Sequence, residues 1–276
     1  MTNRTIGFIG GGNMARSLAK GLLTNGWGRD YLLISDFDPD ARQRLRESLE
    51  VEALESNTEI AERADIIVLA VKPQVLKSVA EEIGPAVQAR QPLVVSIAAG
   101  IRSDDLQVWL GGNVAVVRAM PNTPALVGAG ATGLYAGADV TPAQRDEAET
   151  VLRAAGVVVW VADESLMDVV TALSGSGPAY FLLVMEALEA AAIAQGLDAD
   201  TARLLTLETA FGAAKMALED GESPAVLRER VTSPGGTTEQ AIKSLETNNI
   251  RAAFEQALVA ATERSRELAE LLGKAK

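Results

Sequence analysis

A glycine-rich turn near the amino terminus constrains the fold of this chain more than any other feature. A short apolar strand is predicted over Thr5–Ile9 and a helix over Ala15–Leu23, and Gly10–Ala15 joins them with the spacing G-x-G-x-x-A. In this pattern the first glycine makes a tight turn, the second admits a pyrophosphate, and the small third residue lets the helix pack on the strand. Because the turn lies between a strand and a helix, we predict that a dinucleotide-binding domain begins here.

Predicted strands and helices alternate through residues 1–162. The strands are short apolar runs rich in β-branched residues, a pattern typical of a parallel, doubly wound sheet. We therefore expect an α/β fold with a Rossmann-type N-terminal domain over residues 1–162. The predicted strands are Thr5–Ile9, Tyr31–Ser35, Asp65–Ala70, Leu93–Ile97, Val114–Ala119 and Val157–Val161, and the later helices are Pro73–Ile83, Ser103–Leu110 and Pro142–Ala154.

The sequence pattern of residues 163–276 predicts helices and no strands. The helix that ends near Gln195 and the next one, Ala199–Leu218, have almost no polar face, and such helices are normally buried. A domain of this size cannot enclose two of them, so we expect an all-α dimerisation domain in an obligate homodimer with interleaved helices. A compact monomeric bundle is the alternative.

Composition restricts both the chemistry and the partners of the protein. Its 276 residues include no cysteine and no histidine, which excludes disulfides, zinc fingers and His-based triads, and we expect no metal site. A net charge of −12 without a basic cluster argues against nucleic acid and membranes as partners. The start at Met1–Arg4 shows no signal-peptide pattern and no apolar run reaches about 18 residues, so we expect a cytoplasmic protein.

A second glycine-rich turn, Ser233–Thr238, separates two predicted helices in the C-terminal half. Its two glycines permit φ > 0 and close approach of a ligand, and the free N–H groups of the following helix suit a carboxylate. Hydroxyl groups come from Ser233, Thr237 and Thr238. We interpret the turn as a site for a small anion with a polar atom beside its charge; an ordinary capped helix after a Ser-Pro turn is the alternative.

An acidic residue, Asp36, ends the second predicted strand about 20 residues beyond the first glycines, where it suits the ribose hydroxyls of a dinucleotide. Because its charge would repel a 2′-phosphate, Asp36 favours NADH over NADPH. Asp38, or a plain turn residue before Pro39, is the alternative to this role. Arg42 or Arg44 could still reach a phosphate.

Three more loops follow predicted strands at the ligand end of the sheet: Ala70–Pro73, Ser96–Gly100 and Met120–Pro124. The first begins a helix with proline, the second offers small residues where a flat ring could lie, and the third is stiffened by two prolines. Each alone is consistent with ordinary loop chemistry, and Lys72 with a solvated charge. Their coincidence at the carboxyl ends of the strands favours a cofactor site.

Taken together, these residues resemble the pyrroline-5-carboxylate reductase family over essentially the whole chain. The resemblance rests on six segments in order, which are Gly7–Met14, Ala70–Pro73, Ser96–Gly100, Met120–Pro124, Leu173–Tyr180 and Ser233–Thr238. It implies reduction of L-Δ1-pyrroline-5-carboxylate to L-proline, the last step of proline biosynthesis, with NADPH or NADH. It also implies an active site completed across a homodimer, and in many members a decamer of five dimers.

The resemblance, together with the end of the second strand, provides two sets of candidate residues. Many members carry a short polar residue in place of Asp36 and prefer NADPH, and some have Asn near the substrate in place of Arg230. The candidate cofactor-binding residues are Ile9, Gly10, Gly11, Gly12, Asn13, Met14, Ser35, Asp36, Asn57, Ala70, Val71, Lys72, Pro73, Ile97 and Ala99, and the candidate substrate-binding residues are Glu164, Ser233, Gly236, Thr237 and Thr238.

The implied mechanism depends on positioning in a dry site. Backbone N–H groups of Gly236–Thr238 and the Ser233 hydroxyl are expected to hold the substrate carboxylate, and Thr238 is the candidate catalytic residue that orients the ring nitrogen. Another reductase of the same architecture, such as a 3-hydroxy acid dehydrogenase or a general imine reductase, is one alternative. A non-catalytic dinucleotide sensor is the other.

Overall fold

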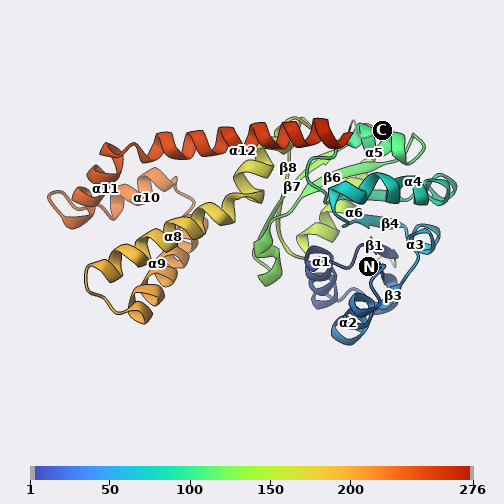
Figure 1. Ribbon diagram of the computed structural model, residues 1–276, viewed down its shortest axis with the longest axis horizontal. Helices are drawn as coiled ribbons and strands as arrows, with labels where there is room; N and C mark the ends of the chain where they lie inside the picture. The colour runs from blue at the N-terminus through green and yellow to red at the C-terminus, as the bar shows by residue number, and fades with distance from the viewer. Residues whose placement is uncertain (1–3, 274–276) are drawn as a thin grey trace. The chain divides into compact units, whose positions relative to one another are not determined.

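The structure is a computed structural model that describes residues 4–273, and these fold into two compact units (Figure 1). The first unit runs to Ser176 and includes the end of the chain from Ala260, and the second unit is Gly177–Val259. These are units of packing, and the functional boundary after residue 162 stays a prediction. The expectation that Met1–Arg4 show no signal-peptide pattern falls mostly on residues 1–3, which lie outside the described residues.

The first unit is built on one sheet with the strand order β3-β2-β1-β4-β5-β6-β7-β8. Strands β1 to β6 are parallel, and the chain moves outward in opposite directions from β1 and β4. Ligands of doubly wound sheets bind at this switch point, beyond the carboxyl ends of the strands. The predicted Rossmann-type fold is confirmed. The strands are β1 (Ile6–Ile9), β2 (Leu32–Ser35), β3 (Glu52–Leu54), β4 (Ile66–Leu69), β5 (Leu93–Ser96), β6 (Val116–Met120), β7 (Gly130–Ala136) and β8 (Gly156–Trp160).

Side chains alternate between the two faces of the sheet, and helices cover each face. Phe8 points into a core shared with α1, α2 and α6, whereas its neighbour Ile9 points into a core shared with α3, α4 and α5. Both side chains are fully buried, which contributes about 1.5–3 kcal/mol each. The helices of this unit are α1 (Asn13–Thr24), η1 (Arg29–Tyr31), α2 (Pro39–Leu49), α3 (Asn57–Arg63), α4 (Pro73–Arg90), α5 (Ser103–Trp109), η2 (Thr123–Val127), α6 (Pro142–Arg153), α7 (Leu166–Val170) and the π-helical turn η3 (Thr171–Gly175).

The last two strands depart from the predicted parallel arrangement. Strand β7 runs antiparallel to β6, and β8 pairs parallel with β7, so both run against β1 to β6. The sequence pattern misses β7 because Gly130 and Gly133 make it look like a loop. At Gly133 a Cβ atom would lie 2.5 Å from Cγ1 of Val170, so the glycine lets α7 pack on the strand.

Helix α4 continues beyond its predicted end at Ile83 and includes Pro85 in its interior. Proline removes one backbone donor and usually breaks a helix. Here Ile83 and Val87, on either side of the proline, are both fully buried in the core. Packing of this apolar face carries the helix past the proline to Arg90.

The second unit is helical and has almost no core of its own. Among its residues α8 buries only Gly177, α9 buries only Ala202, and α11 buries none. Its helices are α8 (Gly177–Ala194), α9 (Ala199–Asp220), α10 (Pro224–Arg230), α11 (Thr237–Thr247) and the first part of α12 (Ile250–Gly273). The exposed apolar side chains of α8 and α9 include Phe181, Leu182, Leu183, Leu188, Leu204, Leu205, Phe211 and Leu218. An apolar surface of this extent marks an interaction site.

One helical stretch of the described chain, Leu166–Ala194, is long and apolar enough to cross a membrane, judged by length and composition alone. The expectation that no stretch reaches this length is therefore wrong. The sequence pattern hides the stretch because small residues around Gly175 interrupt the large apolar ones. Core helices of soluble proteins share this composition.

Candidate active site

Four neighbouring strands of the sheet end at the same level. Their last residues are partners in register across β2, β1, β4 and β5, and these are Ser35, Ile9, Leu69 and Ser96. The residue after each of them begins a loop that carries candidate cofactor residues. In all four loops the first N–H donates to the last carbonyl of the adjacent strand, namely Asp36 to Leu54, Gly10 to Ser35, Ala70 to Ile9 and Ile97 to Leu69. The loops therefore start from one aligned row.

The glycine turn after β1 has the geometry that a pyrophosphate requires. Gly10 has φ +98°, and a Cβ atom there would lie 2.9 Å from the carbonyl oxygen of Ala70. A Cβ atom on Gly12, in contrast, would meet nothing within 4 Å, so the space in front of Gly12 is open. Helix α1 starts at Asn13 without a side-chain cap and without an acidic residue in its first turn. Its first N–H groups are therefore available to a phosphate.

Met14 and Ala15 attach this turn to the rest of the unit. Ala15 is fully buried and Met14 packs partly buried against the same core. The small side chain at position 15 thus lets α1 approach the sheet, as the glycine pattern predicts.

Asp36 is joined to the glycine turn rather than left free. Its Oδ2 accepts a hydrogen bond from the N–H of Gly11 at 2.9 Å, and its Oδ1 accepts one from the N–H of Asp38 at 3.0 Å. The guanidinium of Arg42 donates to the carbonyl oxygens of Asp36 and Phe37 at 2.8 and 3.0 Å. Asp38 caps α2 by accepting from the N–H of Asp40. The structure therefore gives Asp36 and Asp38 different partners.

Two other candidates form one side-chain pair. The hydroxyl of Ser35 donates to Oδ1 of Asn57 at 2.8 Å, and Nδ2 of Asn57 donates to Glu82 at 3.2 Å. Ser35 is completely buried, whereas Asn57 is only partly covered. Of the two side chains, Asn57 is the one that a ligand can reach.

The loops after β4 and β5 carry candidate residues that solvent can reach. Lys72 is exposed, caps α4 without a side-chain hydrogen bond, and forms no ion pair with the residues that the structure describes. Ile97 and Ala99 are partly exposed at the end of β5. An open glycine turn, a free helix start and a small-residue loop suit the pyrophosphate and the flat ring of a dinucleotide.

The second cluster lies in the helical unit, in the turn Ser233–Thr238. Gly235 has φ +72°, and the N–H of Gly236 donates to the carbonyl oxygen of Ser233 at 3.0 Å. Gly236 is also the N-cap of α11, which begins at Thr237 and has no side-chain cap. The N–H groups of Thr237 and Thr238 therefore point out of an uncapped helix start, where they suit a carboxylate.

Two charged residues beside this turn are already paired. Glu239 accepts a hydrogen bond from the N–H of Gly235 at 2.6 Å, which holds the left-handed glycine in place. Arg230 donates two hydrogen bonds to Asp220 at 3.1 and 3.0 Å and lies 3.6 Å from Glu222. The guanidinium of Arg230 is thus neutralised by acidic neighbours.

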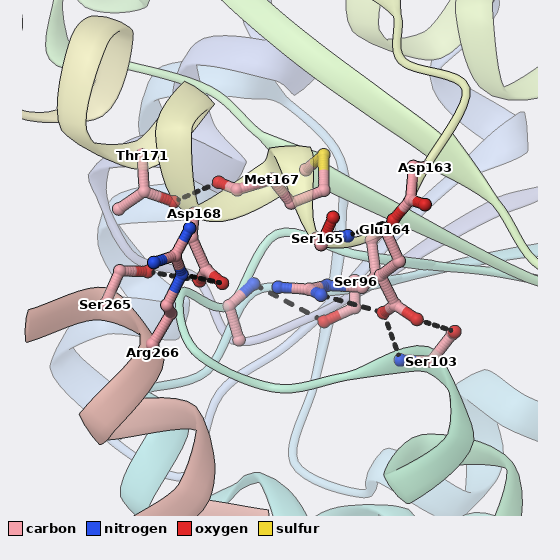
Figure 2. A network of polar contacts seen from close by, with 12 residues as sticks. Ser96, Ser103, Asp163, Glu164, Ser165, Met167, Asp168, Thr171, Ser265 and Arg266 are labelled. Carbon is pink, nitrogen blue, oxygen red and sulfur yellow. Dashed lines mark hydrogen bonds and ion pairs between the residues drawn. The ribbon is translucent and has the colours of Figure 1, made fainter. Parts of the chain in front are cut away.

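Glu164 anchors a polar network in the first unit (Figure 2). Its Oε1 accepts from the N–H of Ser103 and from Arg118, both at 2.7 Å, and its Oε2 accepts from the hydroxyl of Ser103 at 2.7 Å. The side chain of Arg118 is only 8% exposed. Burial, and next the carboxylate of Glu164, raises the pKa of the neighbouring Tyr135 above its usual value.

Sequence reasoning does not select Arg118 or Ser103. Arg118 lies inside the predicted apolar strand Val114–Ala119, and a charged residue in such a strand needs a partner when it is buried. The position of a charged residue within an apolar strand was the one signal in the sequence that could have pointed to Arg118. No spacing in the sequence connects it to Glu164, which lies 46 residues further along.

Comparison with known proteins identifies both halves of the chain. A family model described as pyrroline-5-carboxylate reductase dimerisation matches residues 164–268, and one described as NADP oxidoreductase, coenzyme F420-dependent, matches residues 5–100. The pyrroline-5-carboxylate reductase of Pseudomonas aeruginosa is 50% identical and covers 99% of this chain and 100% of its own. That of Pisum sativum is 40% identical and covers 96% of each chain.

Solved structures give the same result. A pyrroline-5-carboxylate reductase from Coxiella burnetii superposes with a TM-score of 0.94 at 47% identity and covers 97% of this chain and 99% of its own. The Plasmodium falciparum pyrroline carboxylate reductase with NADP bound has a TM-score of 0.85 at 30% identity, and covers 98% of this chain and 99% of its own.

Proposed function

The chain belongs to the pyrroline-5-carboxylate reductase family, and from that premise we propose how its residues reduce L-Δ1-pyrroline-5-carboxylate to L-proline. It is an oxidoreductase of proline biosynthesis that uses NADPH or NADH. The substrate is a cyclic imine with a carboxylate, and the reaction adds a hydride to the imine carbon. The two clusters of candidate residues have complementary parts in this reaction.

The first unit binds the dinucleotide. The open space at Gly12 and the uncapped start of α1 at Asn13 would hold the pyrophosphate, and Asn57 and Asp36 would face the adenosine end. Ile97 and Ala99 would support the nicotinamide ring beyond the end of β5. When bound, the reduced nicotinamide supplies the hydride. The loops Gly10–Met14 and Ala70–Pro73 belong to the same site.

The second unit binds the substrate. The N–H groups at the start of α11, together with the hydroxyl of Ser233, hold the carboxylate. The ring nitrogen carries a proton from solution, and the hydroxyl oxygen of Thr238 accepts a hydrogen bond from this N–H and so orients the C=N bond. No strong general acid is required, because the nitrogen is protonated before the hydride arrives. Alignment of the two reactants is then the main contribution of the protein.

A second copy of the chain covers the apolar helices. The chain carries the family's dimerisation domain, and α8 and α9 expose large apolar side chains along their length. We propose a homodimer with interleaved helices that completes each active site, and five such dimers as a decamer. The stretch Leu166–Ala194 is then covered by protein and not by lipid, in a cytoplasmic enzyme.

The observation that supports this function most strongly is the 50% identity to a pyrroline-5-carboxylate reductase over 99% of the chain. The test is the loss of absorbance at 340 nm when pyrroline-5-carboxylate is added to the purified protein with NADPH or NADH. Oxidation of the cofactor with equimolar formation of proline is expected. Binding of the cofactor without turnover would favour a sensor, and turnover of a 3-hydroxy acid or an unrelated imine in its place would favour another reductase.

A further inference from the structure

Arg118 occupies the row from which the cofactor loops start. In β6 it is the register partner of Ser96, which is itself level with Leu69 and Ile9. Its other register partner is Tyr135 in β7. A buried guanidinium at this level lies one strand away from the loop that carries Ile97 and Ala99.

That loop, residues 97–102, is held at both ends. At its start the N–H of Ala98 donates to the hydroxyl of Ser96 at 3.4 Å, and inside it Gly100 has φ +72°. At its end Ser103 begins α5, whose N-cap residue Arg102 offers no side-chain hydrogen bond. The first N–H groups of a helix need an acceptor, and here none comes from the helix itself.

Glu164 provides this missing acceptor from 61 residues away in the chain. Its carboxylate accepts from both the N–H and the hydroxyl of Ser103 (Figure 2). Arg118 donates to the same carboxylate at 2.7 Å. Both carboxylate oxygens are thus engaged inside the protein. The ion pair is largely buried, and loss of either member would leave an uncompensated charge.

The charges around the network explain why an arginine is needed. Helix α5 carries Asp104 and Asp105 in its first turn, and Asp163 precedes Glu164. Burial and the carboxylates of Glu164, Asp104 and Asp163 raise the pKa of Tyr135, and the cation Arg118 lowers it. Without Arg118, Glu164 would face like charges at the start of α5.

We propose that Arg118 and Glu164 are positioning residues for the cofactor, which act through Ser103 by fixing the loop of residues 97–102 under the nicotinamide ring. Glu164 in this assignment orders the cofactor site and is not a ligand of the substrate. The inference rests on the proposed function, because it takes Ile97 and Ala99 as cofactor contacts.

The test compares matched variants by direct binding and by kinetics. Arg118→Met removes the charge, Arg118→Lys retains it, and Ser103→Ala removes one hydrogen bond. Ser265→Ala is the control. The hydroxyl of Ser265 in α12 donates to the carboxylate of Asp168 at 2.7 Å, a bond of the same kind as that of Ser103 but outside the loop of residues 97–102. The dissociation constant of NADPH is measured by fluorescence titration without substrate, alongside Tm and the KM values of cofactor and substrate.

Arg118→Met is expected to raise the dissociation constants of NADPH and NADH alike by about tenfold, because it removes a charged hydrogen bond. Ser103→Ala removes a neutral one and should raise them by about threefold. Arg118→Lys should recover most of the affinity, and the KM of pyrroline-5-carboxylate at saturating cofactor should stay within about twofold of wild type. Ser265→Ala should lower Tm and leave cofactor binding unchanged.

Three results would overturn the proposal. One is a lower Tm in Arg118→Met and Ser103→Ala with unchanged cofactor binding, since a purely structural network would behave in this way. Another is a Glu164→Gln variant that raises the KM of pyrroline-5-carboxylate alone, which would make Glu164 a substrate ligand. The third is equal loss of cofactor binding in Ser265→Ala. If wild type binds NADPH but does not reduce the imine, the proposed function fails. The dissociation constants of NADPH for the variants and wild type would still test whether Arg118 and Ser103 order the cofactor site.

Discussion

Asp36 holds the glycine turn of the cofactor site, because its carboxylate accepts the N–H of Gly11 at 2.9 Å although 25 residues separate them. The same carboxylate occupies the end of β2, where a doubly wound fold places the adenosine ribose. One side chain therefore shapes the turn that faces the pyrophosphate and sets the charge that a 2′-phosphate would meet. This arrangement leads to a prediction about cofactor preference.

Replacement of Asp36 by serine should shift preference towards NADPH. Removal of one negative charge near a 2′-phosphate is worth about 1 kcal/mol or more, so the ratio of kcat/KM for NADPH over NADH should rise about tenfold. The measurement is initial rates with both cofactors. The serine side chain is also shorter and loses the contact with the N–H of Gly11. We therefore expect kcat/KM to fall with both cofactors, by less than the roughly tenfold change in their ratio.

The control for this experiment is Asp38→Ser. Asp38 caps α2 and lies 3.5 Å from Arg44, so it has a structural explanation of its own. Serine preserves a cap, and the cofactor ratio should stay unchanged. A change of the ratio in Asp38→Ser but not in Asp36→Ser would transfer the role to Asp38.

The two outer glycines of the first turn should fail in different ways when they are replaced by alanine. Gly10→Ala forces a Cβ atom against the carbonyl of Ala70 at a positive φ and should lower Tm by several degrees. Gly12→Ala has room for its methyl group within the protein, so Tm should be preserved while the KM of NADPH rises about tenfold or more. Thermal unfolding and kinetics separate these outcomes, and equal effects on both quantities would argue against an open pyrophosphate approach at Gly12.

Thr238→Ala should reduce kcat/KM for pyrroline-5-carboxylate by roughly 10- to 100-fold, which corresponds to about 1–3 kcal/mol for one hydrogen bond. Thr238→Ser keeps the hydroxyl and should recover most of the loss. Thr247→Ala serves as a control on the same helix, because that hydroxyl donates to the carbonyl oxygen of Lys243 at the other end. Full kcat/KM in Thr238→Ala would remove Thr238 from the mechanism.

Local signals in the sequence predicted the strand, the glycine turn and the helix at the start of the chain, and the structure contains all three. The glycine turn could be predicted because its pattern involves only residues that are close in sequence. The aligned ends of β1, β4 and β5 could be predicted because buried apolar strands form a parallel sheet. Contacts between distant residues were not predictable in the same way. The fully buried hydroxyl of Ser35 and the join between Asp36 and Gly11 depend on register, which a single strand does not reveal.

The edge of the sheet shows the same limit. Gly133 of strand β7 leaves room for Val170 of α7, which is far along the chain, so the local pattern resembles a loop. Arg118 lies in a strand that is otherwise apolar and was not selected from the sequence, and its partner Glu164 could be found only from the fold. The apolar character of α8 and α9 did predict that they need cover, and the single chain leaves them exposed.

Oligomer formation should depend on the exposed face of α9. Phe211 is 65% exposed in the single chain, and a charge at this position would be buried without a partner in an interleaved dimer. Phe211→Glu should therefore yield the 28.9 kDa subunit, where wild type gives twice that mass or a multiple of it. Light scattering after size-exclusion chromatography measures this, with Lys215→Ala as a control on the same helix. An unchanged mass for Phe211→Glu would exclude this face from the interface.

The raised pKa of Tyr135 should affect stability in alkaline solution. The folded protein holds this proton more tightly than the unfolded chain, so the stabilisation is complete below pH 10 and decreases as pH rises through the folded pKa. In that window the free energy of unfolding should fall by up to about 1.4 kcal/mol per pH unit from this group. Urea unfolding of wild type and Tyr135→Phe should show a shallower decrease in the variant, and parallel curves would contradict the assignment.

The most direct test of the account is a crystal structure of the protein with proline and NADP⁺ bound. We expect the carboxylate of proline within hydrogen-bond distance, about 2.7–3.2 Å, of the backbone N–H groups of Thr237 and Thr238, with the Thr238 hydroxyl at the ring nitrogen and the pyrophosphate at Gly12. Electron density that places proline away from residues 233–238 would contradict the account.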